Sequence, residues 1–201
     1  MSRYPIPAKT VRTEMTVKRS RFIATIGHAE TVDGARAFIQ DIRNEMPDAA
    51  HHVYAFRIGY GSSVVEGLSD DGEPAGTSGK PVMSIIRGTD LGDVVIVVTR
   101  YFGGTKLGTG GLVRTYSGAA KEALNRLPVT EKISYITFKA TVSYQAYEPF
   151  KRFLAEYHAN IADEMFTHDV TVIFMAPDEY ATLISEGARE YTVGRVPLIV
   201  K

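Results

Sequence analysis

The segment from Val94 to Leu112 constrains the fold more than any other part of this chain. It opens with an uninterrupted apolar run, Val94 to Val98, which predicts a strand that is covered on both faces. The strand ends in an arginine and two aromatic residues, and a loop rich in glycine follows. From Leu112 to Leu127 apolar residues recur at helical spacing. The segment therefore predicts a buried strand, a glycine-rich loop and an amphipathic helix in direct succession.

The glycine-rich loop also predicts a binding site for an anion. Glycines directly before a helix leave backbone N–H groups uncovered and let a ligand come close to them. The positive end of the helix dipole points to the same place, and basic side chains surround it. An exposed aromatic ring beside these charges can stack on a base of a nucleic acid. The residues expected to form this phosphate or nucleic-acid site are Arg100, Tyr101, Phe102, Gly103, Gly104, Lys106, Gly108, Gly110, Gly111 and Arg114, with Lys80 from a second loop.

The same residues also fit a purely structural role. Glycines serve tight turns, and Arg100 and Arg114 can pair with the acidic side chains of the second long loop, Ser69–Pro81. No Walker sequence accompanies the glycines, which excludes an ordinary P-loop. On the residues alone, the anion site and the structural role both stay open.

Three carboxylates gather in the loop Ser69–Pro81, at Asp70, Asp71 and Glu73. Carboxylates beside a phosphate site can hold Mg²⁺, so these residues are the candidate ligands if the chain binds a metal. Their spacing differs from that of an EF-hand, and acidic side chains also serve turns and ion pairs. We expect turn or ion-pair roles for them and assign neither a metal nor any other cofactor.

Two adjacent histidines, His51 and His52, fall on a predicted strand. Neighbours on a strand point to opposite faces, so the two rings cannot easily bind one metal ion. We expect one of them to be a hydrogen-bonded core or edge histidine, which leaves the other for a site. No serine lies in a nucleophile elbow with histidine and aspartate partners. No catalytic residue is assigned, and the chain is expected to bind rather than to catalyse.

Composition narrows the possible partners only slightly. The 201 residues carry a formal net charge of zero, which marks the chain neither as a nucleic-acid protein nor as a membrane protein. The absence of cysteine fits a reducing compartment. No apolar run is long enough for a signal peptide or a bilayer span. We expect a cytoplasmic protein without membrane contact, whose oligomeric state stays open.

Hydrophobic periodicity divides the chain into an irregular arm and two domains. We expect the arm over residues 1–15, the first domain over residues 16–129 and the second over residues 130–201. Further elements expected in the first domain are a strand over Thr16–Gly27, a helix over Val32–Met46, a hairpin of His52–Tyr60 with Val64–Leu68, and a helix over Pro81–Arg87.

The second domain contains six expected elements in the order strand, helix, strand, strand, helix, strand. Its first strand alternates, and the residues expected to face inward are Ile136, Phe138, Ala140 and Val142. The other elements are a helix over Tyr147–Tyr157, strands over Asn160–Phe166 and Asp169–Met175, a helix over Pro177–Arg189, and a last strand over Tyr191–Val200. This order is that of the ferredoxin-like βαββαβ fold. The expected fold class is therefore α+β in two domains.

Several separated motifs together resemble those of one family. They are Ser20–Ile23, His51–Arg57, Ser69–Pro74, Gly79–Pro81, and Val97–Gly104 with Lys106–Gly108 and Gly110–Arg114. In this order they resemble the Impact family in its bacterial two-domain, YigZ-like form. The resemblance covers residues 16–128 by motif and the rest of the chain by the order of its elements.

The resemblance implies a fold and a cellular setting for the chain. The first domain would share the fold of the second domain of ribosomal protein S-five. The second domain would resemble the ferredoxin-like last domain of elongation factor G. Eukaryotic relatives regulate translation by competing for an activator of a kinase that phosphorylates an initiation factor. The implied partners are the ribosome, RNA or a translation-associated protein.

Three functions are compatible with these observations. The leading hypothesis is a translation-linked regulatory or binding protein with a phosphate or nucleic-acid binding surface on the glycine-rich loop. The first alternative is a Mg²⁺-dependent enzyme that acts on a phosphate ester and uses the acidic loop. The second alternative is a protein–protein adaptor whose loops dock on an acidic patch of a partner.

Overall fold

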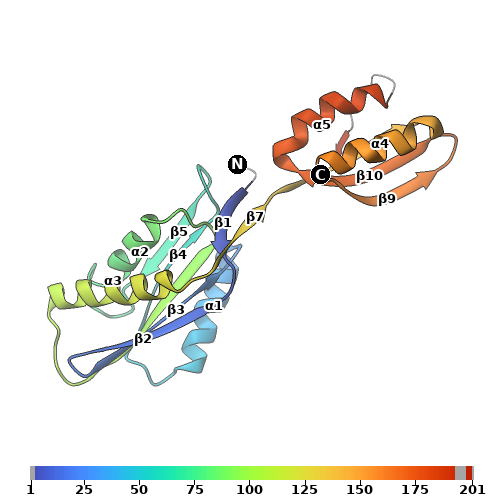
Figure 1. Cartoon of the computed structure of the whole chain (residues 1–201). Helices are drawn as coiled ribbons and strands as arrows, with labels where there is room; N and C mark the ends of the chain where they lie inside the picture. Colours follow the sequence, from blue (N-terminus) through green and yellow to red (C-terminus); the bar gives the residue numbers. More distant parts are fainter. Residues whose placement is uncertain (1–2, 193–197, 201) are drawn as a thin grey trace. The chain divides into compact units, whose positions relative to one another are not determined.

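The computed structural model describes residues 3–192 and 198–200 and divides the chain into two compact units. The N-terminal unit is Tyr4–Lys132, and the C-terminal unit holds Arg3 with the residues from Ile133 onward (Figure 1). The expected domain boundary lies between residues 129 and 130, whereas the observed division follows Lys132. The α+β fold class is confirmed, since both units combine sheets with helices.

The N-terminal unit is built on a five-stranded sheet in which all neighbouring strands are antiparallel. In their order across the sheet, the strands are β2 (Val11–Val17), β3 (Ser20–His28), β6 (Val94–Tyr101), β4 (His51–Ile58) and β5 (Val65–Ser69). The helices are α1 (Val32–Glu45), α2 (Gly79–Arg87) and α3 (Thr109–Asn125). The expected first helix and the hairpin of β4 with β5 are confirmed.

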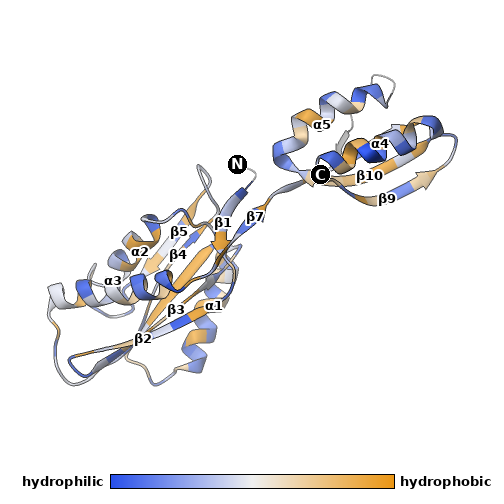
Figure 2. Ribbon diagram, viewed as in Figure 1, coloured by the Kyte–Doolittle hydropathy of each residue, from blue (hydrophilic) through white to orange (hydrophobic). Residues whose placement is uncertain are grey.

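Helices cover both faces of this sheet (Figure 1). On one face α2 and α3 pack over a core that joins Phe22 and Ile96 to Tyr116 of α3. On the other face α1 packs over Val95 and Val97. Figure 2 shows hydrophobic residues concentrated on the central strands. The prediction that the apolar run forms a strand buried on both faces is confirmed, because β6 is the middle strand and its successive side chains supply both cores.

The prediction of an irregular arm over residues 1–15 is wrong. β1 (Arg3–Pro7) pairs with β7 (Val129–Ile133) in a two-stranded sheet, and β2 pairs with β3 along its whole length. The single strand expected over Thr16–Gly27 is likewise the end of β2, a turn, and β3. Prolines and charged residues concealed these strands, because both are tolerated on strands at the edge of a sheet.

The C-terminal unit is a four-stranded antiparallel sheet with two helices. The strands in their order across the sheet are β11 (Leu198–Val200), β8 (Tyr135–Val142), β10 (Val170–Pro177) and β9 (Asn160–Phe166). The helices α4 (Tyr144–Glu156) and α5 (Ala181–Gly187) follow β8 and β10 along the chain. This order and connectivity are those of the ferredoxin-like fold, so that prediction is confirmed.

Details of the C-terminal unit depart from the expected boundaries. Phe138, Ala140 and Val142 are buried as the alternation predicts, and Ile136 is half-buried against them. The helix expected over Pro177–Arg189 is observed as α5 flanked by short 3₁₀ turns. Of the strand expected over Tyr191–Val200, residues 193–197 lie outside the described residues. Within the described part of the chain, no helix is long and apolar enough to cross a membrane.

Candidate functional site

A pocket of about 350 Å³ lies where β6 ends, between the acidic loop and the first turn of α3. Residues from four segments line it: His51, Glu73, Pro74, Arg100, Phe102, Lys106, Leu107, Gly108, Thr109 and Leu112. The antiparallel pairing of β4 with β6 sets His51 directly opposite Arg100, which brings two of these segments together. The lining combines cationic side chains with apolar ones, so the pocket suits a ligand that has both an anionic and an apolar part.

Arg100 lines this pocket and has a buried side chain. Its side chain is 5% exposed, and its Nη1 donates to Oε1 of Glu73 over 2.5 Å. The hydroxyl of Tyr116 donates to the same oxygen over 2.7 Å. Burial, and then the hydrogen bond to Glu73, raise the pKa of Tyr116, so this phenol stays protonated and acts as a donor. The structural role foreseen for Arg100, pairing with an acid of the second loop, is thus present.

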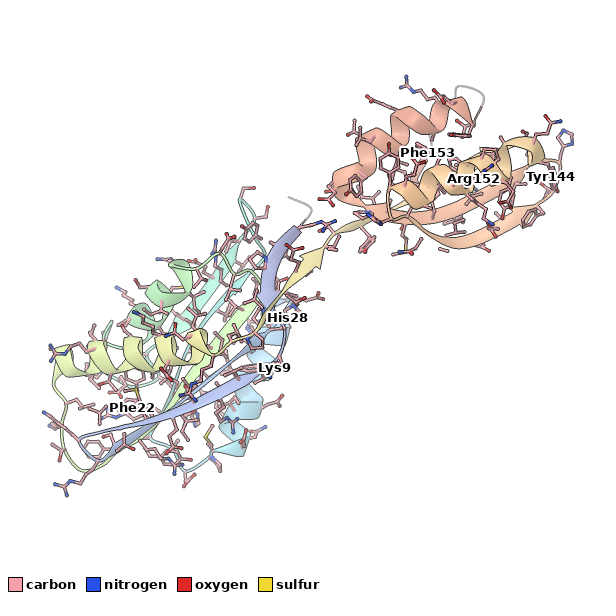
Figure 3. The ribbon with its side chains drawn as sticks, viewed as in Figure 1. Lys9, Phe22, His28, Tyr144, Arg152 and Phe153 are labelled. Carbon is pink, nitrogen blue, oxygen red and sulfur yellow. The ribbon has the colours of Figure 1, made fainter. Side chains whose placement is uncertain are left out.

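One nitrogen of Arg100 remains without a partner. Its Nε is buried and makes no hydrogen bond to any group among the described residues. Its guanidinium carbon lies 5.3 Å from the ring centroid of Phe22 and 5.4 Å from that of Phe102. Figure 3 shows Phe22 between the sheet and α3. A buried donor without an acceptor is costly, so this nitrogen is a local weakness in the packing around Arg100.

The two adjacent histidines have different environments. Nδ1 of His51 lies 2.8 Å from the backbone carbonyl oxygen of Asp71. A carbonyl only accepts, so Nδ1 carries the hydrogen, and in the neutral ring Nε2 is left as an acceptor, 3.9 Å from Oε1 of Glu73. His52 is 7% exposed, and its Nδ1 lies 3.2 Å from the hydroxyl oxygen of Thr99. The structure thus places His51 at the pocket and His52 within the fold.

His52 should make the stability of the protein depend on pH. Burial lowers the pKa of His52, and the nearby charge of Arg43 lowers it further. The unfolded chain therefore takes up the proton at a higher pH than the folded protein, and stability falls as the pH drops below about 6.5. We expect the melting temperature to decrease between pH 7 and pH 5, before carboxylates titrate. In the His52→Asn variant this decrease should be smaller, and an unchanged pH profile would contradict the assignment.

Asp70 organises the acidic loop and the start of α2. Its carboxylate accepts hydrogen bonds from the backbone of Gly76, Ser78 and Gly79 and from the Ser78 hydroxyl. Burial raises the pKa of Asp70, but these hydrogen bonds outweigh burial and hold that pKa below its usual value. Asp70 therefore serves the loop itself.

The other two acids of the loop also have partners within the protein. Asp71 pairs with Arg43 and accepts a hydrogen bond from the backbone N–H of His52, and Glu73 holds Arg100 as described above. In the described part of the chain, one group of at least three acidic or histidine side chains has its possible ligand atoms within 4.8 Å of one another: His28, Glu30 and Asp93. The Nζ of Lys132 is bound to both acids of that group. All three acids of the acidic loop thus have partners within the protein, and none of them belongs to the group of described residues that could hold a metal ion.

The glycine-rich loop follows from β6 and leads into α3. A Cβ at Gly103 would lie 2.1 Å from the carbonyl carbon of Arg19, so this position must be glycine for the two segments to touch. Gly104 and Gly108 have φ of 80° and 74°, a region that favours glycine. Among the described residues, no side chain caps the N-terminus of α3. Its first N–H groups are therefore available next to the pocket.

The structure brings part of the expected site together. Arg100, Phe102, Lys106 and Gly108 line the pocket. The other expected residues do not line it: Tyr101, Gly103, Gly104, Gly110, Gly111, Arg114 and Lys80. Side chains alternate along β6, so Tyr101 points to the face of α1 and its hydroxyl donates to Asp48.

Several residues of the site were not foreseen as members of it. Pro74, Leu107, Thr109 and Leu112 line the pocket. Pro74, Leu107 and Leu112 fall within motifs of the family resemblance, whereas Thr109 lies outside them. Ser20 is fully buried, and its hydroxyl accepts hydrogen bonds from the backbone N–H of Gly103 and from Arg100. Its place in the first motif of the family resemblance was the available signal.

Comparisons with known proteins identify relatives over nearly the whole chain. The family model described as Impact N-terminal domain matches residues 18–124. An IMPACT family member of Haemophilus influenzae is 36% identical over 98% of this chain and 96% of its own length. The IMPACT family member YigZ of Escherichia coli is 33% identical over 99% of this chain and 98% of its own length.

Structural comparison agrees with the sequence comparison. A crystal structure described as that of a hypothetical protein covers 100% of this chain and 98% of its own, with a TM-score of 0.74 and 33% identity. Proteins named IMPACT from Xenopus and Saccharomyces cerevisiae match shorter stretches. The family model spans the strands, the glycine-rich loop and the helix that build the pocket. The chain therefore belongs to the Impact family.

Proposed function

We propose that this protein is a translation-linked regulatory protein that binds phosphate groups of nucleic acid at the pocket beside α3. The observation that carries the proposal is a pocket that Arg100 and Lys106 line and that borders the N-terminus of α3, which no side chain among the described residues caps. A phosphate oxygen would accept hydrogen bonds from the first N–H groups of α3 and from Lys106, and the positive end of the helix dipole would stabilise its charge.

The remaining lining of the pocket supports a nucleotide-sized ligand. The volume of about 350 Å³ lies within the usual range of small-ligand pockets, about 300–1,000 Å³. Lys106 is exposed and has no ion-pair partner among the described residues, so its charge is available to a ligand. Phe102 is 52% exposed, and a base can stack on its ring.

Family membership supports the link to translation. The family resemblance implies that eukaryotic members regulate translation, and the chain matches IMPACT proteins of Xenopus and yeast. An RNA or a ribosomal surface is therefore the partner that we propose for the pocket. The acidic loop, which is fully used within the protein, gives no support to the alternative of a Mg²⁺-dependent enzyme.

The Lys106→Glu variant tests the binding site. We expect it to bind a single-stranded RNA oligonucleotide more weakly, with a salt dependence reduced by about 0.7 in log–log slope, because one phosphate is no longer neutralised. Fluorescence anisotropy between 50 mM and 200 mM salt measures both effects. Lys121→Glu, an exposed lysine further along α3, is the matched control and should behave as the wild type. Binding that does not depend on salt, or that Lys106→Glu leaves unchanged, would contradict the proposal.

Co-sedimentation with ribosomes tests whether the protein binds them through RNA. The wild type should sediment with ribosomes from the cells that produce it, and Lys106→Glu should remain in the supernatant. Nuclease treatment should release the wild type. Sedimentation that survives both the variant and the nuclease would indicate a protein–protein contact and would support the adaptor hypothesis in place of this one.

A further inference from the structure

The turn between β2 and β3 presents two cations in an unusual backbone conformation. Val17 pairs with Ser20, so Lys18 and Arg19 alone form the turn. Both are exposed, and their φ angles are 45° and 69°. We call these two residues the basic tip.

The conformation of the basic tip disfavours the residues that occupy it. A two-residue hairpin with positive φ at both positions prefers Asn-Gly, because residues with longer side chains are strained in this region. Strain of this kind concentrates at functional sites, where the side chain matters more than the ease of the turn. At the basic tip, the side chains that replace the favoured pair are both positively charged.

The basic tip touches the loop that leads into the pocket. The backbone of Arg19 packs directly on Gly103, where no Cβ could fit. Ser20, the next residue, accepts a hydrogen bond from the N–H of Gly103 over 3.1 Å. Gly103 follows Phe102, the exposed aromatic residue of the pocket. In Figure 1 the blue turn of β2 and β3 accordingly lies beside the yellow-green loop before α3.

Two cations near this surface have acidic partners, whereas among the described residues the cations of the basic tip do not. Glu73 neutralises Arg100, and Glu14 lies 3.7 Å from Arg21. In the described part of the chain, by contrast, neither residue of the basic tip takes part in an ion pair. The exposed ring of Phe102 shares the pocket with the free cation of Lys106, and the basic tip contacts Gly103, the next residue along the chain. Cations near an exposed ring suit a strand of alternating bases and phosphates.

We propose that the pocket and the basic tip together bind a single-stranded polynucleotide. This rests on the proposed function and extends it from one nucleotide to the neighbouring one. A base stacks on Phe102 with its phosphate at the pocket, and the adjacent phosphate contacts Lys18 and Arg19. The strand is single because a base that stacks on a protein ring cannot remain inside a duplex.

The test compares oligonucleotides with a mononucleotide. Anisotropy is measured with labelled oligouridylate, oligothymidylate and a duplex of equal length, and uridine monophosphate binding is followed by NMR. The tip variant Lys18→Glu with Arg19→Glu carries the same charge change as its control, Lys9→Glu with Lys121→Glu, two exposed lysines outside this surface. A second tip variant, Lys18→Asn with Arg19→Gly, gives the turn its preferred sequence and so guards against misfolding.

We expect both tip variants to bind a single strand about tenfold more weakly, and the salt slope to fall by about 0.7 for each phosphate that is no longer neutralised. Uridine monophosphate binding should not change in them, and the control should bind oligonucleotides like the wild type. Loss of oligonucleotide binding in Lys106→Glu but not in the tip variants would overturn this inference and leave the proposed function standing. A duplex that binds as tightly as a single strand would also overturn it. No binding of any probe by the wild type would overturn both proposals.

Discussion

Replacing Glu73 with alanine is expected to lower the free energy of unfolding by about 3–5 kcal/mol, the cost of breaking a buried ion pair by removing one partner. Glu73 and Arg100 have side chains that are 4% and 5% exposed, so the guanidinium charge cannot be compensated by solvent. The same change takes away the acceptor of the Tyr116 hydroxyl, which is itself fully buried. Because the chain contains no tryptophan, urea unfolding should be followed by circular dichroism.

A double variant separates the missing charge partner from the missing volume. Glu73→Leu with Arg100→Met replaces the whole pair by apolar side chains, which often costs little, so it should be more stable than Glu73→Ala. Glu122→Ala, which breaks the exposed pair with Arg126, is the surface control and should cost less than about 0.5 kcal/mol. A Glu73→Ala variant that loses no more stability than this control would show that solvent reaches Arg100.

Glu73→Ala also bears on the proposed pocket. Without Glu73 the charge of Arg100 is free to bind an added anion. Inorganic phosphate should therefore raise the melting temperature of Glu73→Ala more than that of the wild type, because a ligand stabilises the state that binds it. An equal response of the two proteins would mean that phosphate does not reach Arg100.

The sequence alone identified the elements that build the site, but not how they meet. The apolar run of β6, the glycine-rich loop and α3 were all predictable, because hydrophobic periodicity and glycine act locally. The partner of Arg100 was not, since any of three acids in the loop Ser69–Pro81 had the right charge. Only the folded loop shows that Asp70 and Asp71 are used elsewhere, which leaves Glu73 for Arg100.

The alternation of side chains along β6 explains why the sequence did not show which aromatic residue lies at the pocket. Arg100, Tyr101 and Phe102 are adjacent, and the sequence alone did not decide which aromatic residue belongs to the site. Alternation sends Tyr101 to the face of α1, whereas Phe102 lies at the pocket. The basic tip was missed for a different reason: it depends on β2, a strand that the charged residues on its outer side concealed.

Changing Gly103 to alanine is expected to cost about 3 kcal/mol of stability, in the upper part of the range for an overpacked site. The added Cβ would lie 2.1 Å from backbone atoms of Arg19, and backbone cannot move aside as a flexible side chain can. The hydrogen bond from the N–H of Gly103 to Ser20 should break as the loop and the basic tip are forced apart. Thermal unfolding followed by circular dichroism measures the decrease in stability.

The same substitution within α3 provides the control for Gly103→Ala. At Gly118 a Cβ would meet nothing within 4 Å, so Gly118→Ala should stabilise the protein, by up to about 1 kcal/mol, through helix propensity. If the basic tip and Phe102 bind one strand together, Gly103→Ala should also weaken oligonucleotide binding at temperatures where it remains folded, while Gly118→Ala should not. A folded Gly103→Ala protein with wild-type affinity would mean that the contact between the turn and the loop serves stability alone, and that the two surfaces act on ligands independently.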